Sequence, residues 1–121
     1  MPALISWWRQ DLADLIPFAL DDAVQAAGTD LLRRWGQPQR RYHRTTHLVE
    51  LFWALEELED GEGLDAHDAL LGRVAGWFHD AVYLPLAPAG ANEADSARLA
   101  VSTLTELGGD DGDTARVERL V

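Results

Sequence analysis

The sequence ALLGRVAGWFHDAVY, residues 69–83, decides the fold because it is apolar on most sides when it is wound into a helix. A helix that is hydrophobic nearly all round lies at the centre of a domain rather than on its surface. Asp65 precedes this stretch and is a favourable N-cap residue. We therefore predict a central helix that begins near Asp65 and continues to Tyr83.

One face of this central helix carries only small residues and one histidine. Gly72, Ala75 and Gly76 share that face with His79. Each glycine inside a helix costs about 1 kcal/mol relative to alanine. Two glycines on one face therefore indicate that another helix packs very closely there, and the helix predicted over 42–60 is the best candidate.

The segments that precede the central helix also have helical apolar spacing. A first helix is expected to end at Pro17, a second to span 21–35, and a third to run from Tyr42 to about Asp60. The core-facing residues expected in these three helices are Trp8, Leu12, Leu15, Ile16, Val24, Ala27, Leu31, Leu32, Trp35, His43, His47, Leu51, Ala54, Leu55 and Leu58.

Two more helices are predicted after the central one. Asn92 is expected to cap a fifth helix and Asp113 a last one. The fold class is therefore all-α, a bundle of about five to six helices in a single domain over 1–121. The expected inward residues are Ala97, Ala100, Val101 and Leu104 in the fifth helix and Val117, Leu120 and Val121 in the last.

The end of the sequence has no signal that stops a helix. The last helix is only about two turns long and ends on two apolar residues, which makes it marginal on its own. We expect the chain to stop inside this helix, so that the domain is incomplete at its C-terminal side.

Composition excludes several classes of protein. The chain has 121 residues, of which 47% are hydrophobic and 26% charged, which is typical of a globular domain rather than a disordered one. The formal net charge of −11 argues against general binding to DNA, RNA or anionic lipid. There is no cysteine, so a metal would need histidine or carboxylate ligands.

The sequence contains no segment that resembles a membrane span or a secretory signal. The uncharged stretch 81–92 is short and contains two prolines, and the first 20 residues have no basic start. We expect a cytoplasmic protein that does not associate with a membrane.

Two short motifs carry most of the candidate chemistry. His43 and His47 are four residues apart, so on a helix they share a face and can approach one ion. His79 and Asp80 are adjacent within an apolar stretch, where a buried carboxylate needs a metal, a cation or several N–H donors. The alternatives are a polar helix edge for the first motif and an arginine salt bridge for the second.

A third pair, His67 and Asp68, lies in a polar setting at the start of the central helix. Acidic residues in a first turn are favoured by the helix dipole. We therefore expect this pair to be solvated surface rather than part of a site.

Basic residues gather around His43, although the chain as a whole is acidic. Arginine side chains bind phosphate oxygens well, so the cluster points to an anionic substrate; the alternative is a solvated helix end. Asn92 and Glu93 follow a loop rich in proline and glycine and would lie at the rim of the site, although both also suit a helix start. The clustered residues are Arg33, Arg34, Arg40, Arg41 and Arg44.

Taken together, these motifs resemble the HD superfamily of metal-dependent phosphohydrolases, and in particular a bacterial branch of predicted HD phosphohydrolases. The resembling segments are Tyr42-His43-x-x-x-His47-Leu48, Phe78-His79-Asp80-Ala81-Val82-Tyr83 and Asn92-Glu93-x-x-Ser96-Ala97. The first is also similar to the opening motif of cyclic-nucleotide phosphodiesterases. The resemblance covers the chain from about Leu31 onward and implies an HD-like helical bundle.

The resemblance also implies roles for individual residues. His47, His79 and Asp80 would be metal ligands, and His43 would be the general acid that protonates the leaving group; Asp80 counts as catalytic as well. Arg40, Arg41, Arg44, Asn92 and Glu93 would contact the substrate. The implied reaction is hydrolysis of a phosphomonoester, a phosphodiester or a nucleotide by a metal-activated water.

The chain departs from the HD pattern in two respects. The loop over residues 84–91 contains no acidic residue, so a second metal would have few ligands unless Glu93 supplies one. The other departure concerns an aspartate. HD enzymes use a further aspartate on a later helix, and Asp110, Asp111 and Asp113 come too early for that role. The expected aspartate would follow Val121. The divalent metal could be Mn, Fe, Co, Ni, Zn or Mg, because nitrogen and oxygen ligands do not select among them.

Two other functions remain open from the sequence. One is a non-catalytic HD-like module that binds a metal or a nucleotide as a sensor. The other is a helical interaction domain in which Trp7, Trp8 and the acidic surface form the interface of a homo-oligomer.

Overall fold

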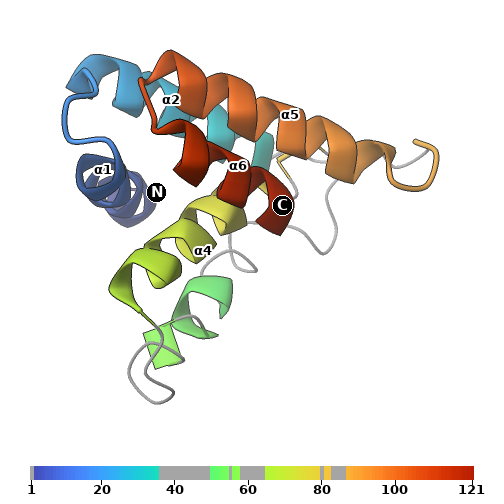
Figure 1. Ribbon diagram of the computed structural model, residues 1–121, viewed down its shortest axis with the longest axis horizontal. Helices are drawn as coiled ribbons and strands as arrows, with labels where there is room; N and C mark the ends of the chain where they lie inside the picture. The colour runs from blue at the N-terminus through green and yellow to red at the C-terminus, as the bar shows by residue number, and fades with distance from the viewer. Residues whose placement is uncertain (1, 36–49, 55, 58–64, 80, 83–86) are drawn as a thin grey trace.

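The computed structural model describes residues 2–35, 50–54, 56–57, 65–79, 81–82 and 87–121, and all regular secondary structure in these ranges is helical (Figure 1). This confirms the all-α class. Residues 50–54 and 56–57 are helical and are called the Trp53 segment below. The other described helices are α1 (Pro2–Leu15), α2 (Asp21–Trp35), α4 (Ala66–Phe78), α5 (Ala91–Glu106) and α6 (Asp111–Leu120).

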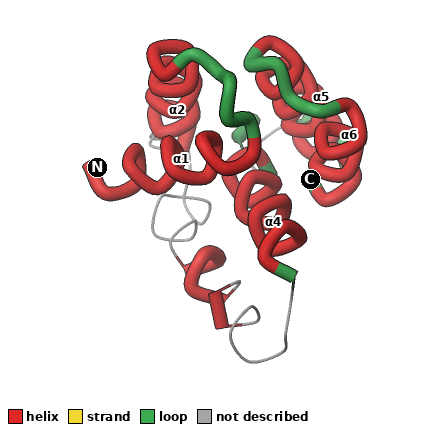
Figure 2. Tube along the Cα trace, turned by 60° about the vertical axis from the view of Figure 1, so that its left-hand side comes forward, coloured by secondary structure: helices red, strands yellow, loops and turns green. Residues whose placement is uncertain are grey.

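Helix α4 is the centre of the arrangement. Figure 2 shows α1 and α2 on one side of it and α5 and α6 on the other. Eight of its residues are buried, which confirms that the apolar stretch forms the central helix. They are Ala69, Leu70, Leu71, Val74, Ala75, Gly76, Trp77 and Phe78.

The central helix begins as predicted but ends earlier. The Asp65 side chain accepts a hydrogen bond from the backbone N–H of His67, so Asp65 is the N-cap. The helix ends at Phe78 rather than continuing to Tyr83. Past Phe78, the His79 side chain bonds to the Gly76 carbonyl, and the Ala81 N–H bonds to the Phe78 carbonyl three residues back, while the Trp77 carbonyl accepts from the Trp35 indole.

Tryptophan side chains join the helices of the core. Trp8 is fully buried, meets Trp77 edge to face at 5.5 Å between ring centroids, and donates from Nε1 to the Val24 carbonyl at 2.7 Å. Trp35 Nε1 donates to the Trp77 carbonyl at 2.9 Å. The expectation that Trp8 forms an oligomer interface is therefore wrong, because no part of its surface is accessible.

The glycine face of α4 is covered as predicted. A Cβ atom added to Gly76 would lie 2.8 Å from Leu51 Cδ2 and 3.3 Å from Phe52 Cε1. The predicted inward position of Ala54 is wrong, since Ala54 is exposed and Phe52 is buried. Leu51 and Phe52 straddle Gly76, and at about 100° per residue Ala54 then points away from α4.

The caps of the last two helices differ from the prediction. Gly90, with a φ of 82°, precedes α5, so Asn92 lies inside the first turn and is not the N-cap. Asp110 caps α6 by accepting from the N–H of Asp113, so Asp113 is not the N-cap either. In α6 Val117 is buried, but Leu120 is 56% exposed, which corrects its predicted inward position.

Glycines close the turn between α5 and α6. Gly108 N–H bonds to the Thr105 carbonyl and Gly109 N–H to the Leu104 carbonyl, with Gly108 at a φ of 91°. These two hydrogen bonds form a Schellman motif, which satisfies the last carbonyls of α5. The turn reverses the chain, so that α6 packs back against α5. Among the described helices none is long and apolar enough to cross a membrane.

Candidate functional site

A cavity of about 340 Å³ lies beside the C-terminal half of α4. The glycine face of α4 forms its floor, and the Trp53 segment and the end of α6 form its walls. His79 is the one ionisable side chain among the described residues that line it. These are Leu51, Gly72, Ala75, Gly76, His79, Leu120 and Val121.

The imidazole of His79 is held in a fixed orientation. Its Nδ1 lies 2.6 Å from the Gly76 carbonyl oxygen. A carbonyl only accepts, so Nδ1 carries the proton and the lone pair is on Nε2. Metal-binding histidines commonly have this arrangement, in which one ring nitrogen donates to the protein and the other binds the ion.

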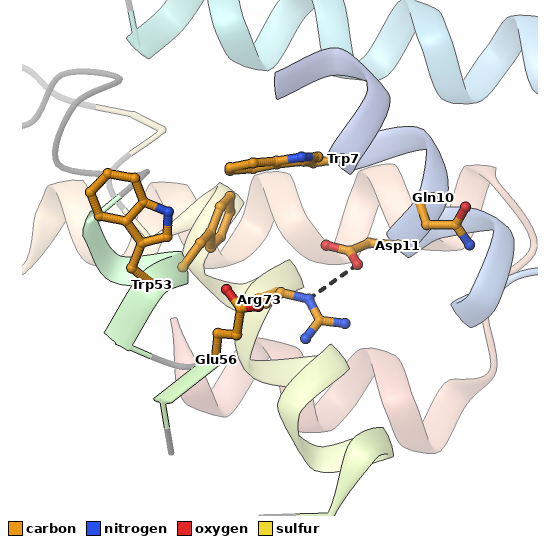
Figure 3. Close-up of a pocket in the computed structure, with 7 residues that line it drawn as sticks. Trp7, Gln10, Asp11, Trp53, Glu56 and Arg73 are labelled. Atoms are coloured by element: carbon orange, nitrogen blue, oxygen red, sulfur yellow. Dashed lines mark hydrogen bonds and ion pairs between the residues drawn. The ribbon is translucent and has the colours of Figure 1, made fainter. Parts of the chain in front are cut away.

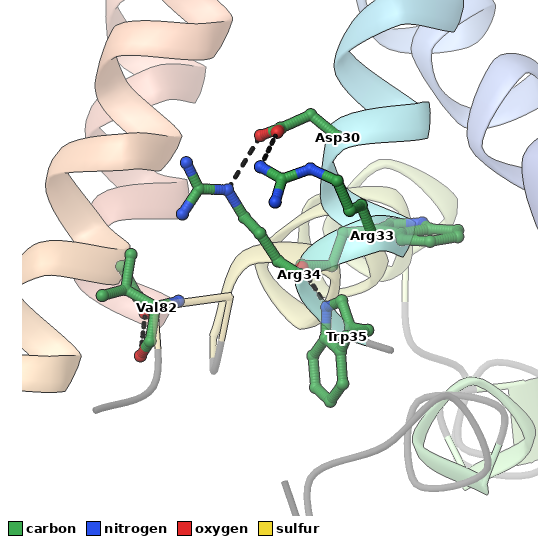
Figure 4. A network of polar contacts seen from close by, with 7 residues as sticks. Asp30, Arg33, Arg34, Trp35 and Val82 are labelled. Carbon is green, nitrogen blue, oxygen red and sulfur yellow. Dashed lines mark hydrogen bonds and ion pairs between the residues drawn. The ribbon is translucent and has the colours of Figure 1, made fainter. Parts of the chain in front are cut away.

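Trp35 supports His79 from α2. The two ring centroids are 5.4 Å apart with an interplanar angle of 49°. Figure 4 shows Trp35 below Arg33 and Arg34 at the end of α2, with its indole N–H engaged in a hydrogen bond. Trp35 was predicted only as a core residue, and its contact with His79 adds a positioning role that helical spacing does not reveal.

Two arginines of the predicted cluster are engaged within α2. Arg33 Nη2 lies 2.7 Å and Arg34 Nε 2.8 Å from the two carboxylate oxygens of Asp30 (Figure 4). Burial raises the pKa of Asp30, but the hydrogen bonds from Arg34 and Arg33 outweigh it, so this pKa lies below its ordinary value. Of the two interpretations of the arginine cluster, a salt bridge at a helix end is the one that the structure shows for Arg33 and Arg34.

The second turn of α5 is tied to the segment that follows His79. Ser96 is fully buried, and its Oγ accepts from Val82 N–H at 3.0 Å. The bond joins α5 to a residue three positions after His79. Asn92, one turn before Ser96, is half-buried, whereas Glu93 is exposed. No role was predicted for Ser96, although it belongs to the segment Asn92-Glu93-x-x-Ser96-Ala97 that carries the resemblance.

The second histidine–aspartate pair of α4 is on the surface, as predicted. His67 Nε2 lies 3.0 Å from Asp113 and Asp68 lies 2.6 Å from Arg116 Nη2. Both pairs link the start of α4 to α6. His67 and His79 are about 18 Å apart along the helix, so His67 does not belong to the cavity.

The remaining predicted site residues lie outside the described part of the chain. They are His43, His47, Asp80, Arg40, Arg41 and Arg44. Within the described ranges, no three histidine or acidic side chains gather in a group suited to a metal ion. The chemistry of an imidazole fits a metal ligand, and His79 is the one residue of the predicted ligand set that the structure describes.

A comparison of the chain with protein-family models, with curated proteins and with solved structures found no match.

Proposed function

We propose that this protein is a metal-dependent phosphohydrolase of the HD type that acts on a phosphomonoester, a phosphodiester or a nucleotide. The observation that carries the proposal is the cavity at the C-terminal end of α4, with His79 at its edge and the glycine face as its floor. The sequence resemblance supplies the chemistry expected there.

Two features of the cavity support a ligand role for His79. Nδ1 donates to the Gly76 carbonyl, so Nε2 is the ring nitrogen with the chemistry to bind a metal ion. The contact of Leu51 with Gly76 brings the Trp53 segment to the same cavity. His47 precedes Leu51 by four residues, and this spacing predicts that it shares the face of Leu51.

Each residue then has a distinct task. His79, His47 and Asp80 would hold a divalent metal, which when bound polarises a phosphoryl oxygen and lowers the pKa of a water. His43 would donate a proton to the leaving oxygen, a role that suits an imidazole near neutral pH. Arg40, Arg41 and Arg44 would neutralise the phosphoryl charge, and Asn92 would orient the substrate from α5.

Val121 lines the same cavity. The proposal does not require Glu93 to touch the substrate, because its side chain is exposed.

Hydrolysis of p-nitrophenyl phosphate and of bis-p-nitrophenyl phosphate tests the proposal. The wild-type protein is loaded in turn with Mn²⁺, Co²⁺, Ni²⁺, Zn²⁺ or Mg²⁺ and compared with His79→Ala. We expect turnover with at least one metal and a loss of 100-fold or more in His79→Ala, since a ligand contributes at least as much as the roughly 10- to 100-fold of outer partners.

His67→Ala is the matched control, because it removes a histidine from the opposite end of the same helix. Its rate should equal that of the wild type. Equal rates in wild type and His79→Ala would remove the enzyme proposal. Metal binding by calorimetry without turnover would instead favour the sensor function.

A further inference from the structure

A second cavity, of about 270 Å³, opens between α1, the Trp53 segment and α4. It is separate from the His79 cavity, because the packing of Leu51 and Phe52 on Gly76 lies between them. We call it the aromatic cleft. Its described lining residues are Trp7, Gln10, Asp11, Phe52, Trp53, Glu56 and Arg73.

Three aromatic rings surround this cleft. Trp7 is 41% and Trp53 60% exposed. Exposing two large apolar side chains around one cleft is unfavourable in water, and such patches commonly mark binding sites. The rings of Trp7 and Phe52 meet at 61° with centroids 6.3 Å apart. This edge-to-face contact packs Trp7 against Phe52 on one side of the cleft, and the two exposed indoles of Trp7 and Trp53 are its accessible aromatic surface.

Carboxylates complete the lining. Figure 3 shows the side chains of Trp7, Trp53, Asp11 and Glu56 arranged around this space, with Arg73 beside Asp11. Arg73 Nε donates to Asp11 Oδ1 at 3.1 Å, and the two side chains are only 25% and 10% exposed. Their charges offset each other, which leaves the exposed carboxylate of Glu56 as the net charge of the lining.

We propose that the aromatic cleft binds a small quaternary ammonium compound. The exposed indoles of Trp7 and Trp53 attract a desolvated cation, and Glu56 adds a negative charge at the rim. The chain's net charge of −11 raises the local concentration of cations further. An anion would meet Glu56 and Asp11 around the single guanidinium of Arg73, so the same lining disfavours it.

Choline is the probe, followed by ¹H–¹⁵N NMR of the tryptophan indoles. The chain has five tryptophans, of which Trp8, Trp35 and Trp77 are fully buried. We expect the indole signals of Trp7 and Trp53 to shift with choline concentration and the three buried ones to stay in place. 3,3-Dimethyl-1-butanol, the neutral isostere of choline, should bind much more weakly.

Two variants locate the binding energy. Trp53→Leu should weaken choline binding between about twofold and thirtyfold, the range of a cation–π contact, and Glu56→Gln should weaken it severalfold. Glu57→Gln is the matched control, since Glu57 is exposed and does not line the cleft. Circular dichroism checks that each variant is folded, and the exposure of Trp53 and Glu56 makes unfolding unexpected.

Several results would overturn the proposal. Equal binding of choline and its neutral isostere would show an apolar pocket without selectivity for charge. Equal weakening by Glu56→Gln and Glu57→Gln would show only general attraction to an acidic surface. Co-sedimentation with phosphatidylcholine vesicles, without binding of free choline, would assign the cleft to a lipid headgroup rather than to a soluble compound.

Discussion

Replacement of Gly28 by alanine tests the packing of α1 against α2. Gly28 is a buried residue of α2, and a Cβ atom there would lie 2.7 Å from Ile5 Cδ1 and 2.8 Å from Trp8 Nε1, and closer still to Trp8 Cδ1. The Ile5 methyl is the end of a flexible side chain and can move. The Trp8 ring cannot move easily, because it meets Trp77 and Phe78 and donates to the backbone.

The expected loss of stability follows from three terms. Alanine in place of glycine favours the helix by about 1 kcal/mol. Overpacking a core costs about 1–3 kcal/mol, and displacing Trp8 from the Val24 carbonyl adds about 1–3 kcal/mol for an unsatisfied buried donor. The costs exceed the gain, so Gly28→Ala should lower the free energy of unfolding by about 1–5 kcal/mol.

Urea unfolding followed by circular dichroism at 222 nm measures this change. Ala26→Gly is the control, because Ala26 is an exposed residue of the same helix and its replacement should cost only the propensity term of about 1 kcal/mol. If Gly28→Ala were as stable as the wild type or more stable, Trp8 would have room to shift, and the close approach of α1 and α2 would not be a constraint.

Three further outcomes are expected. Burial raises the pKa of Asp11 in the folded chain, so its contribution to stability falls as pH rises from the ordinary value of 3.8 toward the raised one. In urea titrations, the unfolding free energy of the wild type minus that of Asp11→Asn should therefore decrease across that window. A difference that does not change with pH would contradict this expectation. Asp110→Ala removes the cap of α6 and should lower the free energy of unfolding by about 1 kcal/mol. Asp113→Ala removes only the surface pair with His67 and should cost less. The reverse order in chemical denaturation would indicate that Asp113 is the cap. Trp35→Phe leaves the buried Trp77 carbonyl without its indole donor and should cost about 1–3 kcal/mol, and an unchanged melting temperature would show that the bond is unimportant.

Periodicity predicted the elements whose buried faces are continuous. The bounds of α2 are those expected, and the burial of α4 follows from its apolar run. The two glycines of α4 predicted a close neighbour, and Leu51 fulfils that role at Gly76. Such features depend on sequence spacing alone, so they can be inferred without coordinates.

Local competition between polar groups explains the errors. Asn92 and Gly90 both suit the start of a helix, and the positive φ of Gly90 decided the outcome. The early end of α4 depends on the bond from His79 to the Gly76 carbonyl, which no apolar pattern encodes. Phe52 was missed because Gly76 of α4 packs against both Leu51 and Phe52, and Phe52 does not belong to the apolar stripe predicted from helical spacing.

Only part of the candidate site was open to prediction and test. His79 lies beside a cavity, whereas His43, His47 and Asp80 lie outside the described residues, and the metal-binding roles of all four remain predictions. The aromatic cleft was not predicted, because its lining comes from three segments far apart in the chain. Charge and aromatic content alone do not show which side chains meet.

The indole bond from Trp35 to the Trp77 carbonyl has a consequence for the order of folding. It joins positions 42 residues apart, whereas α1 with α2, and α5 with α6, are neighbours in the chain joined by short connections. Local hairpins close quickly, and distant pairings incur a larger loss of chain entropy before they form. The two helical hairpins should therefore assemble first and the Trp35–Trp77 junction late, so that changes at Trp35 accelerate unfolding more than they slow folding.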